Sequence, residues 1–124
     1  MSKLSWGLIL FLLLLSLLGC SSGPNFPVGT YEIDHHGKPW VMEFMDDGEW
    51  KGYYDGELYA SGTYSISGHQ LTFSTDDYCD ELRPKPATYT WAYDDGLLTF
   101  QLVGEDPCLD RKTVVDNKTY TKQP

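Results

Sequence analysis

Basic residues are scarce in this sequence. Its 124 residues hold 9 Lys and Arg against 18 Asp and Glu, which gives a net charge of −9 at neutral pH. Nucleic-acid binding needs a stripe of basic side chains that neutralises phosphates, and docking of a folded surface on anionic lipid needs the same. We therefore expect no nucleic-acid partner and no attraction of the folded surface to an anionic bilayer.

The common catalytic signatures are also missing. The sequence has no His-Glu-x-x-His, Gly-x-Ser-x-Gly, Walker or Rossmann glycine motif. Its carboxylate pairs, Asp46-Asp47 and Asp94-Asp95, precede glycines, as is typical of hairpin turns. His35 and His36 are adjacent, so on a strand they would face opposite sides and chelate zinc poorly. We expect no enzyme, no metal and no other cofactor.

The longest apolar run, Trp6–Leu18, is too short for a transmembrane helix, which needs about 20 apolar residues. It follows a short basic start that contains Lys3 and ends before a Gly-Cys pair. A basic start and a short apolar core predict a secretory signal peptide over residues 1–19. The remaining residues, 20–124, suffice for one small domain.

The segment Leu17-Leu18-Gly19-Cys20 resembles the lipobox of bacterial lipoproteins. The resemblance implies that Cys20 carries diacylglycerol, becomes the new N-terminus and is acylated there with a chain such as palmitate. Two or more acyl chains anchor a protein stably. We expect a lipid-anchored protein of the bacterial cell envelope that faces the periplasm or the exterior. Residues 20–27 would form a tether, which Pro and Gly keep out of regular structure.

From Val28 onward the hydrophobic period is two, which predicts strands rather than helices of useful length. Leu58, Ala60, Tyr64 and Ile66, for example, are expected to share one buried face. Asp-Gly and Ser-Gly pairs between the strands favour tight hairpins. Short connections favour an all-β, eight-stranded antiparallel up-and-down barrel over residues 28–124. The expected strands are 30–34, 39–45, 49–54, 58–66, 70–75, 87–93, 97–103 and a last one within 112–122, which Asp116-Asn117 could split.

Several short motifs resemble those of small bacterial lipocalin-like lipoproteins of the calycin type. The segment Gly29-Thr30-Tyr31 is similar to the lipocalin Gly-x-Trp, with Tyr in place of Trp. The other motifs are Ser61-Gly-Thr-Tyr64, Ser67-Gly-His-Gln-Leu71, Tyr89-Thr-Trp91 and Asp106-Pro-Cys108 with Arg111. The resemblance covers residues 28–122 and implies a lipocalin-like barrel with a binding or structural function. The lipocalin Trp packs against an Arg, and the sequence leaves open whether Tyr31 and Arg111 do the same.

With Cys20 lipidated, two cysteines remain, Cys79 and Cys108. Two cysteines in an exported protein are expected to form a disulfide. The connections of a meander alternate between its two ends, so the loops after the fifth and seventh strands, which hold these cysteines, lie at the same end. Their bridge would stabilise the fold by about 3–4 kcal/mol.

The same alternation places the loops after the first, third, fifth and seventh strands opposite the tether. We expect this end to point away from the membrane and to be the interaction surface, or otherwise a solvated loop end. An alternative function is therefore an inhibitor or protein-interaction module, similar to lysozyme or protease inhibitors, that attracts a basic protein. The loops carry His35, His36, Asp55, Glu57, Asp76, Asp77, Asp80, Glu81, Glu105, Asp106 and Asp110.

Large aromatic residues dominate the expected inward face. They would fill much of an eight-stranded barrel and leave either a packed core or a small pocket at one mouth for a small apolar ligand. We expect a monomer. The inward set is Tyr31, Trp40, Met42, Phe44, Trp50, Tyr54, Tyr64, Phe73, Tyr89, Trp91, Tyr93 and Phe100. The candidate pocket residues among them are Tyr31, Trp50, Tyr64, Tyr89, Trp91, Tyr93 and Phe100.

Overall fold

A computed structural model of the chain describes residues 25–77, 79 and 85–124. The expected signal peptide, Cys20, Asp80 and Glu81 lie outside the described residues. The described part folds into eight strands and one short helix, α2 (Leu109–Val115). The strands are β1 (Gly29–His35), β2 (Lys38–Phe44), β3 (Glu49–Tyr54), β4 (Glu57–Ser67), β5 (Gln70–Asp76), β6 (Ala87–Asp94), β7 (Leu97–Val103) and β8 (Thr119–Lys122).

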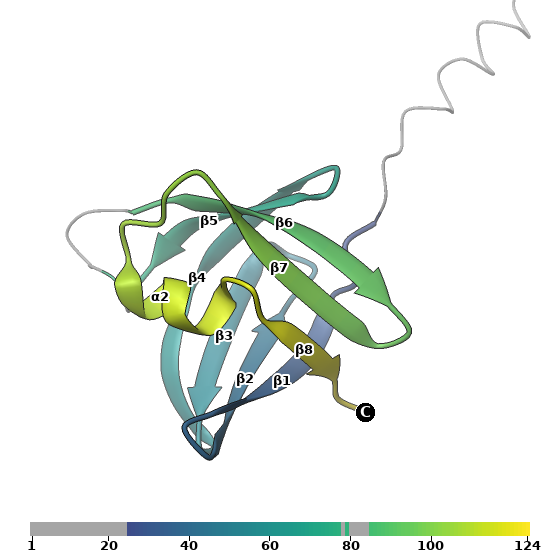
Figure 1. Cartoon of the computed structure of the whole chain (residues 1–124), viewed down its shortest axis with the longest axis vertical. Helices are drawn as coiled ribbons and strands as arrows, with labels where there is room; N and C mark the ends of the chain where they lie inside the picture. The colour runs from purple at the N-terminus through teal and green to yellow at the C-terminus, as the bar shows by residue number, and fades with distance from the viewer. Residues whose placement is uncertain (1–24, 78, 80–84) are drawn as a thin grey trace, which may run out of the picture.

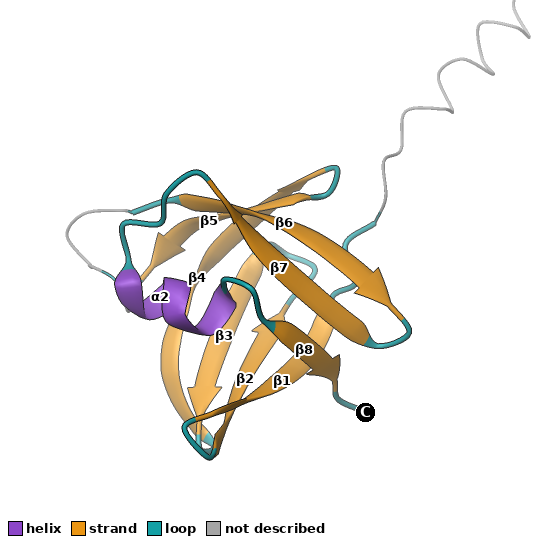
Figure 2. Cartoon of the chain, in the orientation of Figure 1, coloured by secondary structure: helices purple, strands orange, loops and turns teal. Residues whose placement is uncertain are grey.

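Each strand pairs antiparallel with the next, and β8 returns to pair with β1 (Figures 1 and 2). The result is a closed up-and-down barrel, so the predicted fold class is confirmed. Three hairpin turns have two successive residues with positive φ, the geometry of type I′ turns that suits the twist of paired strands. They are His36-Gly37, Asp55-Gly56 and Asp95-Gly96.

Side chains fill the centre of the barrel. Aromatic rings meet there edge to face, with centroid separations of 5.3 Å for Phe44 and Tyr64 and 5.6 Å for Trp50 and Phe73. Edge-to-face pairs add to the free energy gained by burial. Of the expected inward set, Tyr54 is half-buried and Tyr93 is 39% exposed, while the other members are buried.

Two β-bulges shift the register around β4. In the first, Gly52 pairs with Ala60 and Tyr53 pairs with Leu58, so Tyr59 is an extra residue in β4. The prediction that Leu58 shares the buried face of Ala60 is therefore wrong, and Leu58 is 59% exposed. Bulges bend a strand and re-aim single side chains.

Strand β8 lies within the range 112–122 predicted for the last strand, but the prediction that no helix precedes it is wrong. Residues 109–115 form α2, which lies at the barrel end beside the loops after β5 and β7 (Figure 1). Arg111, Val114 and Val115 are buried, whereas Leu109 is 75% exposed. The buried positions follow the i, i+3, i+4 spacing of one helical face. The helix gives way to β8 through Asn117, which has a φ of 59°.

Candidate functional site

Phe26 closes the barrel end at which the described chain begins. Its ring centroid lies 5.2 Å from that of Phe44, 5.8 Å from Tyr64 and 5.3 Å from Trp91. The Tyr31 hydroxyl donates a 2.6 Å hydrogen bond to the carbonyl of Pro27. Phe26 and Pro27 were predicted to belong to the tether, but they pack against this end of the barrel.

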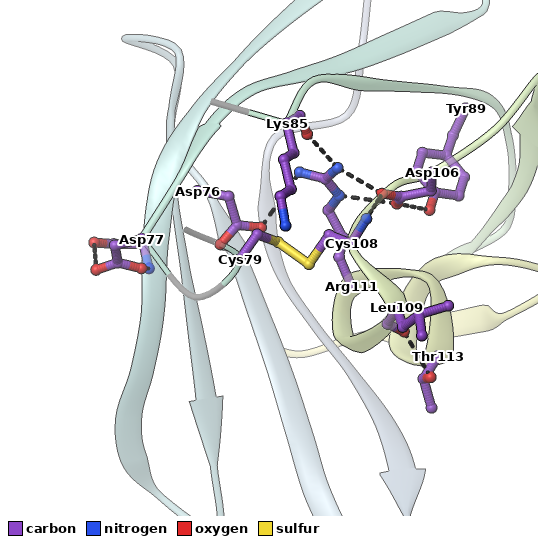
Figure 3. The surroundings of a disulfide bond; sticks show 11 residues. Asp76, Asp77, Cys79, Lys85, Tyr89, Asp106, Cys108, Leu109, Arg111 and Thr113 are labelled. Carbon is purple, nitrogen blue, oxygen red and sulfur yellow. Dashed lines mark hydrogen bonds and ion pairs between the residues drawn. A yellow bond between two sulfur atoms is a disulfide. The ribbon is translucent and has the colours of Figure 1, made fainter. Parts of the chain in front are cut away.

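A disulfide between Cys79 and Cys108 secures part of the opposite end, as predicted (Figure 3). It joins the connection after β5 to the residue that precedes α2. The two Cα atoms are 5.5 Å apart, and the bridge spans 29 positions of the sequence. The helix is thus tied covalently to a loop that it meets only in the folded chain.

Arg111 of α2 pairs with two buried carboxylates, Asp76 at the end of β5 and Asp106 in the loop after β7 (Figure 3). Its side chain is 2% exposed, and its Nε and Nη2 donate hydrogen bonds of 2.9 and 2.6 Å to Asp106. Its Nη1 lies 3.5 Å from Asp76 Oδ2, and its Nη2 also donates a 2.5 Å hydrogen bond to the Lys85 carbonyl. The hydroxyl of Tyr89 donates to Asp106 as well.

The electrostatics of this cluster indicate a structural role. Burial alone would raise the pKa of Asp106, but hydrogen bonds from Arg111, Tyr89 and the Cys108 N–H hold it below its ordinary value. Burial and the hydrogen bond to Asp106 both raise the pKa of Tyr89. Asp106 therefore stays ionised and Tyr89 stays protonated. A charged pair that is satisfied by further hydrogen bonds fixes the geometry around it.

The lipocalin-like contact between Tyr31 and Arg111 does not form. The guanidinium carbon of Arg111 lies 5.5 Å from the centroid of Phe73, while the Tyr31 hydroxyl bonds to Pro27 at the other end. Burial raises the pKa of Tyr31 to about 12. Tyr31 and Arg111 thus stabilise opposite ends of the barrel.

A pocket of about 210 Å³, the mouth pocket, opens at the barrel end that carries α2. It lies between the hairpins β1–β2 and β3–β4 and the helix. Its lining consists almost entirely of rings, which is typical of sites for small ligands with apolar or cationic groups. The lining residues are His35, His36, Trp40, Tyr54, Tyr59 and Val114.

The first β-bulge builds one wall of the mouth pocket. Tyr59, the extra residue, is 54% exposed, and its ring centroid lies 6.3 Å from both Trp40 and Tyr54. Trp40 and Tyr54 are directly paired across β2 and β3. Glycine at position 52 makes room for the indole, since a Cβ there would lie 2.8 Å from the Trp40 ring. The bulge brings Tyr59 to Trp40 and Tyr54, and Gly52 leaves the space that the Trp40 ring occupies.

The two histidines form the rim of the mouth pocket. Their ring centroids are 4.1 Å apart, and the ring of His35 lies 5.9 Å from that of Tyr54. Burial, His36 and Lys118 lower the pKa of His35 below 6.5, and Asp34 opposes them. His35 is therefore uncharged at neutral pH.

The residues expected to line a pocket belong largely to the core. Trp50 borders a small void of about 10 Å³ beside Arg111, which is large enough for about one water molecule. Tyr93 is partly exposed, with its ring 6.5 Å from that of Tyr31. The remaining five are buried and pack around the barrel axis: Tyr31, Tyr64, Tyr89, Trp91 and Phe100.

Trp40 and Tyr54 were predicted to lie inside the barrel but not to line a pocket, and Tyr59 was predicted in neither role. Gly52 is the feature of the sequence that could have indicated the pocket, because a glycine inside a strand often marks the close approach of another group. Its neighbours in space, however, cannot be read from the sequence.

A broader depression of about 520 Å³ runs along the seam between β1 and β8. The register pairs Tyr31 with Lys122 and Glu32 with Thr121, and the Gln123 N–H donates a 2.8 Å hydrogen bond to the carbonyl of Thr30 beside them. The lining is mostly polar, which suits solvent better than a small apolar ligand: Glu32, Ile33, Asp34, Asn117, Lys118, Thr119, Thr121 and Gln123.

Comparison of the chain with protein-family models, curated proteins and solved structures finds no match. Within residues 25–77, 79 and 85–124, no three His, Cys, Asp or Glu side chains are grouped as metal ligands would be. The same residues include no helix that is long and apolar enough to cross a membrane.

Proposed function

We propose that this chain is an exported bacterial lipoprotein whose lipocalin-like barrel binds a small ligand at the mouth pocket. Cys20 anchors it in a membrane of the cell envelope, and the barrel faces the periplasm or the exterior. The observation that supports binding is the group of aromatic rings around the mouth pocket, at the end opposite the one that Phe26 closes. Rigid strands and short hairpins position these rings before any ligand arrives, which lowers the cost of binding.

The anchor is tested by radiolabelled palmitate in a bacterial host. We expect the full chain to incorporate label and to sediment with membranes, because the lipobox directs acylation of Cys20. Cys20→Ser should abolish both, whereas the neighbouring substitution Ser21→Ala should retain them. Label in the Cys20→Ser protein would refute anchoring through this cysteine.

Ligand binding is tested on the Cys20→Ser chain by intrinsic fluorescence, because Trp40 lines the mouth pocket. Titration with small apolar and organic ionic compounds should change the emission in a saturable way. The matched control is Leu58→Ala, which alters an exposed neighbour of the pocket residue Tyr59. Unchanged emission throughout such a series would count against a binding function.

The inhibitor alternative is less well supported by the side-chain contacts. Asp76 and Asp106, two of the carboxylates expected to attract a basic partner, are buried against Arg111. Asp77 accepts hydrogen bonds from the backbone and the hydroxyl of Ser61. We therefore expect lysozyme to retain full activity in the presence of micromolar protein at low salt.

A further inference from the structure

We infer that the mouth pocket binds the quaternary ammonium group of a small organic cation, held against the rings of Trp40, Tyr54 and Tyr59. The inference rests on the proposed binding function and names its ligand class. Three features support it: the arrangement of the rings, the charges around the rim and the size of the pocket.

The rings form walls rather than a stack. The plane of Tyr59 makes angles of 80° with Trp40 and 69° with Tyr54. The ring of His35 continues the enclosure at 71° to Tyr54. A cation is attracted to the negative face of an aromatic ring within about 6 Å of its centroid, and steeply inclined rings can present several such faces to one group. A flat apolar ligand would instead favour parallel faces.

The charges around the pocket favour a cation over an anion. Three exposed carboxylates, Asp34, Asp55 and Glu57, lie on the adjacent hairpins, against two lysines, Lys38 on the same hairpins and Lys118 near His35. Lys38, which follows the first turn, is 3.3 Å from Asp55 in an ion pair. The chain as a whole has a net charge of −9, so its field attracts cations and repels anions.

The lining favours a quaternary ammonium over a metal ion or a primary amine. None of the six lining residues has a carboxylate, so Ca²⁺ or Mg²⁺ would lack oxygen ligands, and the two histidines are fewer than the three or four ligands of a zinc site. A primary ammonium is strongly hydrated and would lose water without gaining an ion pair. A quaternary ammonium has no N–H to satisfy, and aromatic rings recognise it well.

The volume of about 210 Å³ is below the usual range of about 300–1,000 Å³ for pockets that enclose a whole drug-sized ligand. It suits a head group whose remaining part extends into solvent past the exposed His36 and Tyr59. We therefore expect a small cation such as choline to be a sufficient probe.

Binding should weaken in acid. His35 faces the pocket, with His36, Lys118, Asp34 and the ring of Tyr54 around it. The uncharged imidazole tolerates a neighbouring cation, whereas the imidazolium repels it. The affinity should therefore fall as the pH is lowered through the titration of His35, and replacing both rim histidines, His35→Gln with His36→Gln, should flatten this dependence.

The deciding experiment compares choline with its uncharged carbon analogue, in which a quaternary carbon replaces the nitrogen. Both are titrated into the Cys20→Ser chain at pH 7.5 and followed by tryptophan emission and calorimetry. We expect choline to bind about tenfold more tightly, because the two probes share shape and differ in charge. Tyr59→Leu should remove most of this preference, while Leu58→Ala should keep it. Thermal unfolding checks that both variants remain folded.

Equal affinity for the two probes would overturn the cation inference and leave the proposed small-ligand function standing. A preference for choline that survives Tyr59→Leu would overturn the assignment to these rings. If choline, its analogue and the wider ligand series all fail to bind at tens of millimolar, both the inference and the proposed binding function are refuted.

Discussion

Replacing Arg111 with Met tests whether the buried ion cluster stabilises the fold. The substitution keeps the length and apolar stem of the side chain but removes the charge between Asp106 and Asp76. Both carboxylates are buried, so at neutral pH they would lose their main compensating charge. The carbonyl of Lys85 would also lose a donor.

Breaking a buried ion pair on one side typically costs about 3–5 kcal/mol, mostly because a charge stays buried without its partner. The two carboxylates around Arg111 place this site at the upper part of that range. Small domains have a total stability of about 5–15 kcal/mol. For about 100 residues, each kcal/mol shifts Tm by roughly 4–8 °C, so a cost of about 4–5 kcal/mol should lower Tm by at least about 16 °C.

The effect should depend on pH with a defined sign. In the wild type, the pKa of Asp106 lies below its ordinary value of 3.8, so its stabilisation is present above that value and is lost as the pH falls through the folded-state pKa. In Arg111→Met, burial without the guanidinium favours the protonated carboxyl, so acid relieves the defect. The difference in unfolding free energy between the two proteins should therefore be larger at pH 7 than at pH 4.

The assay is urea unfolding, followed by far-ultraviolet circular dichroism at both pH values with the disulfide intact. Lys112→Met, at an exposed position of the same helix, is the control and should change stability little. Adding Asp106→Asn to Arg111→Met should recover part of the loss, because it removes one unpaired charge. A cost below about 1 kcal/mol at pH 7 would refute a stabilising role for the cluster.

Three further changes test other parts of the fold. Replacing Cys79 and Cys108 with Ser should lower the unfolding free energy by about 3–4 kcal/mol, because the unfolded chain gains entropy without the bridge. Urea unfolding measures this loss of stability. Gly52→Ala should displace the indole of Trp40 and alter its near-ultraviolet circular dichroism, since the new Cβ would lie 2.8 Å from the ring. Phe26→Ala should lower the unfolding free energy by about 1–3 kcal/mol. The loss should be smaller than for a fully buried Phe, because the ring of Phe26 is only half-buried. An unchanged urea midpoint would show that Phe26 is merely part of the tether.

The strands and the disulfide could be predicted because local signals determine them. Turn glycines such as Gly56 and Gly96 have positive φ values of 83°, where other residues are strained, so each marks a hairpin in the sequence. Once the hairpins are placed, the alternation of connections brings Cys79 and Cys108 to one end. No long-range packing needs to be known for either step.

The helix could not be predicted in the same way. Thr113, Val114 and Val115 are β-branched, and such residues favour strands. In the folded chain, Val114 and Val115 are buried on the same side of α2 as Arg111. The free energy gained from that packing outweighs their local preference for a strand. Asp106 is only five residues from Arg111, but its other partners, Asp76 and Lys85, are distant in the sequence, so the sequence alone does not reveal why this segment is helical.

The mouth pocket depends on the same kind of long-range information. Strict alternation assigns Leu58 to the buried face, but the bulge turns Leu58 outward and lets Tyr59 reach Trp40 and Tyr54. The bulge appears only when the register of β3 and β4 is known. Similarly, composition treats Asp106 as a solvated loop residue, whereas its buried partners make it structural.

The α2 end of the barrel therefore has two parts, one that stabilises the fold and one that forms the mouth pocket. The disulfide and the hydrogen bonds of Arg111 tie α2 to the loops after β5 and β7, and that part stabilises the fold. The hairpins β1–β2 and β3–β4 leave their rings facing an open pocket, in which Val114 is the contribution of the helix. The bonds that stabilise α2 do not involve the ring of Tyr59. A substitution of Tyr59 can therefore change ligand affinity without loss of the fold. Stability and binding should thus respond to separate substitutions, with Val114 as the position where both are affected.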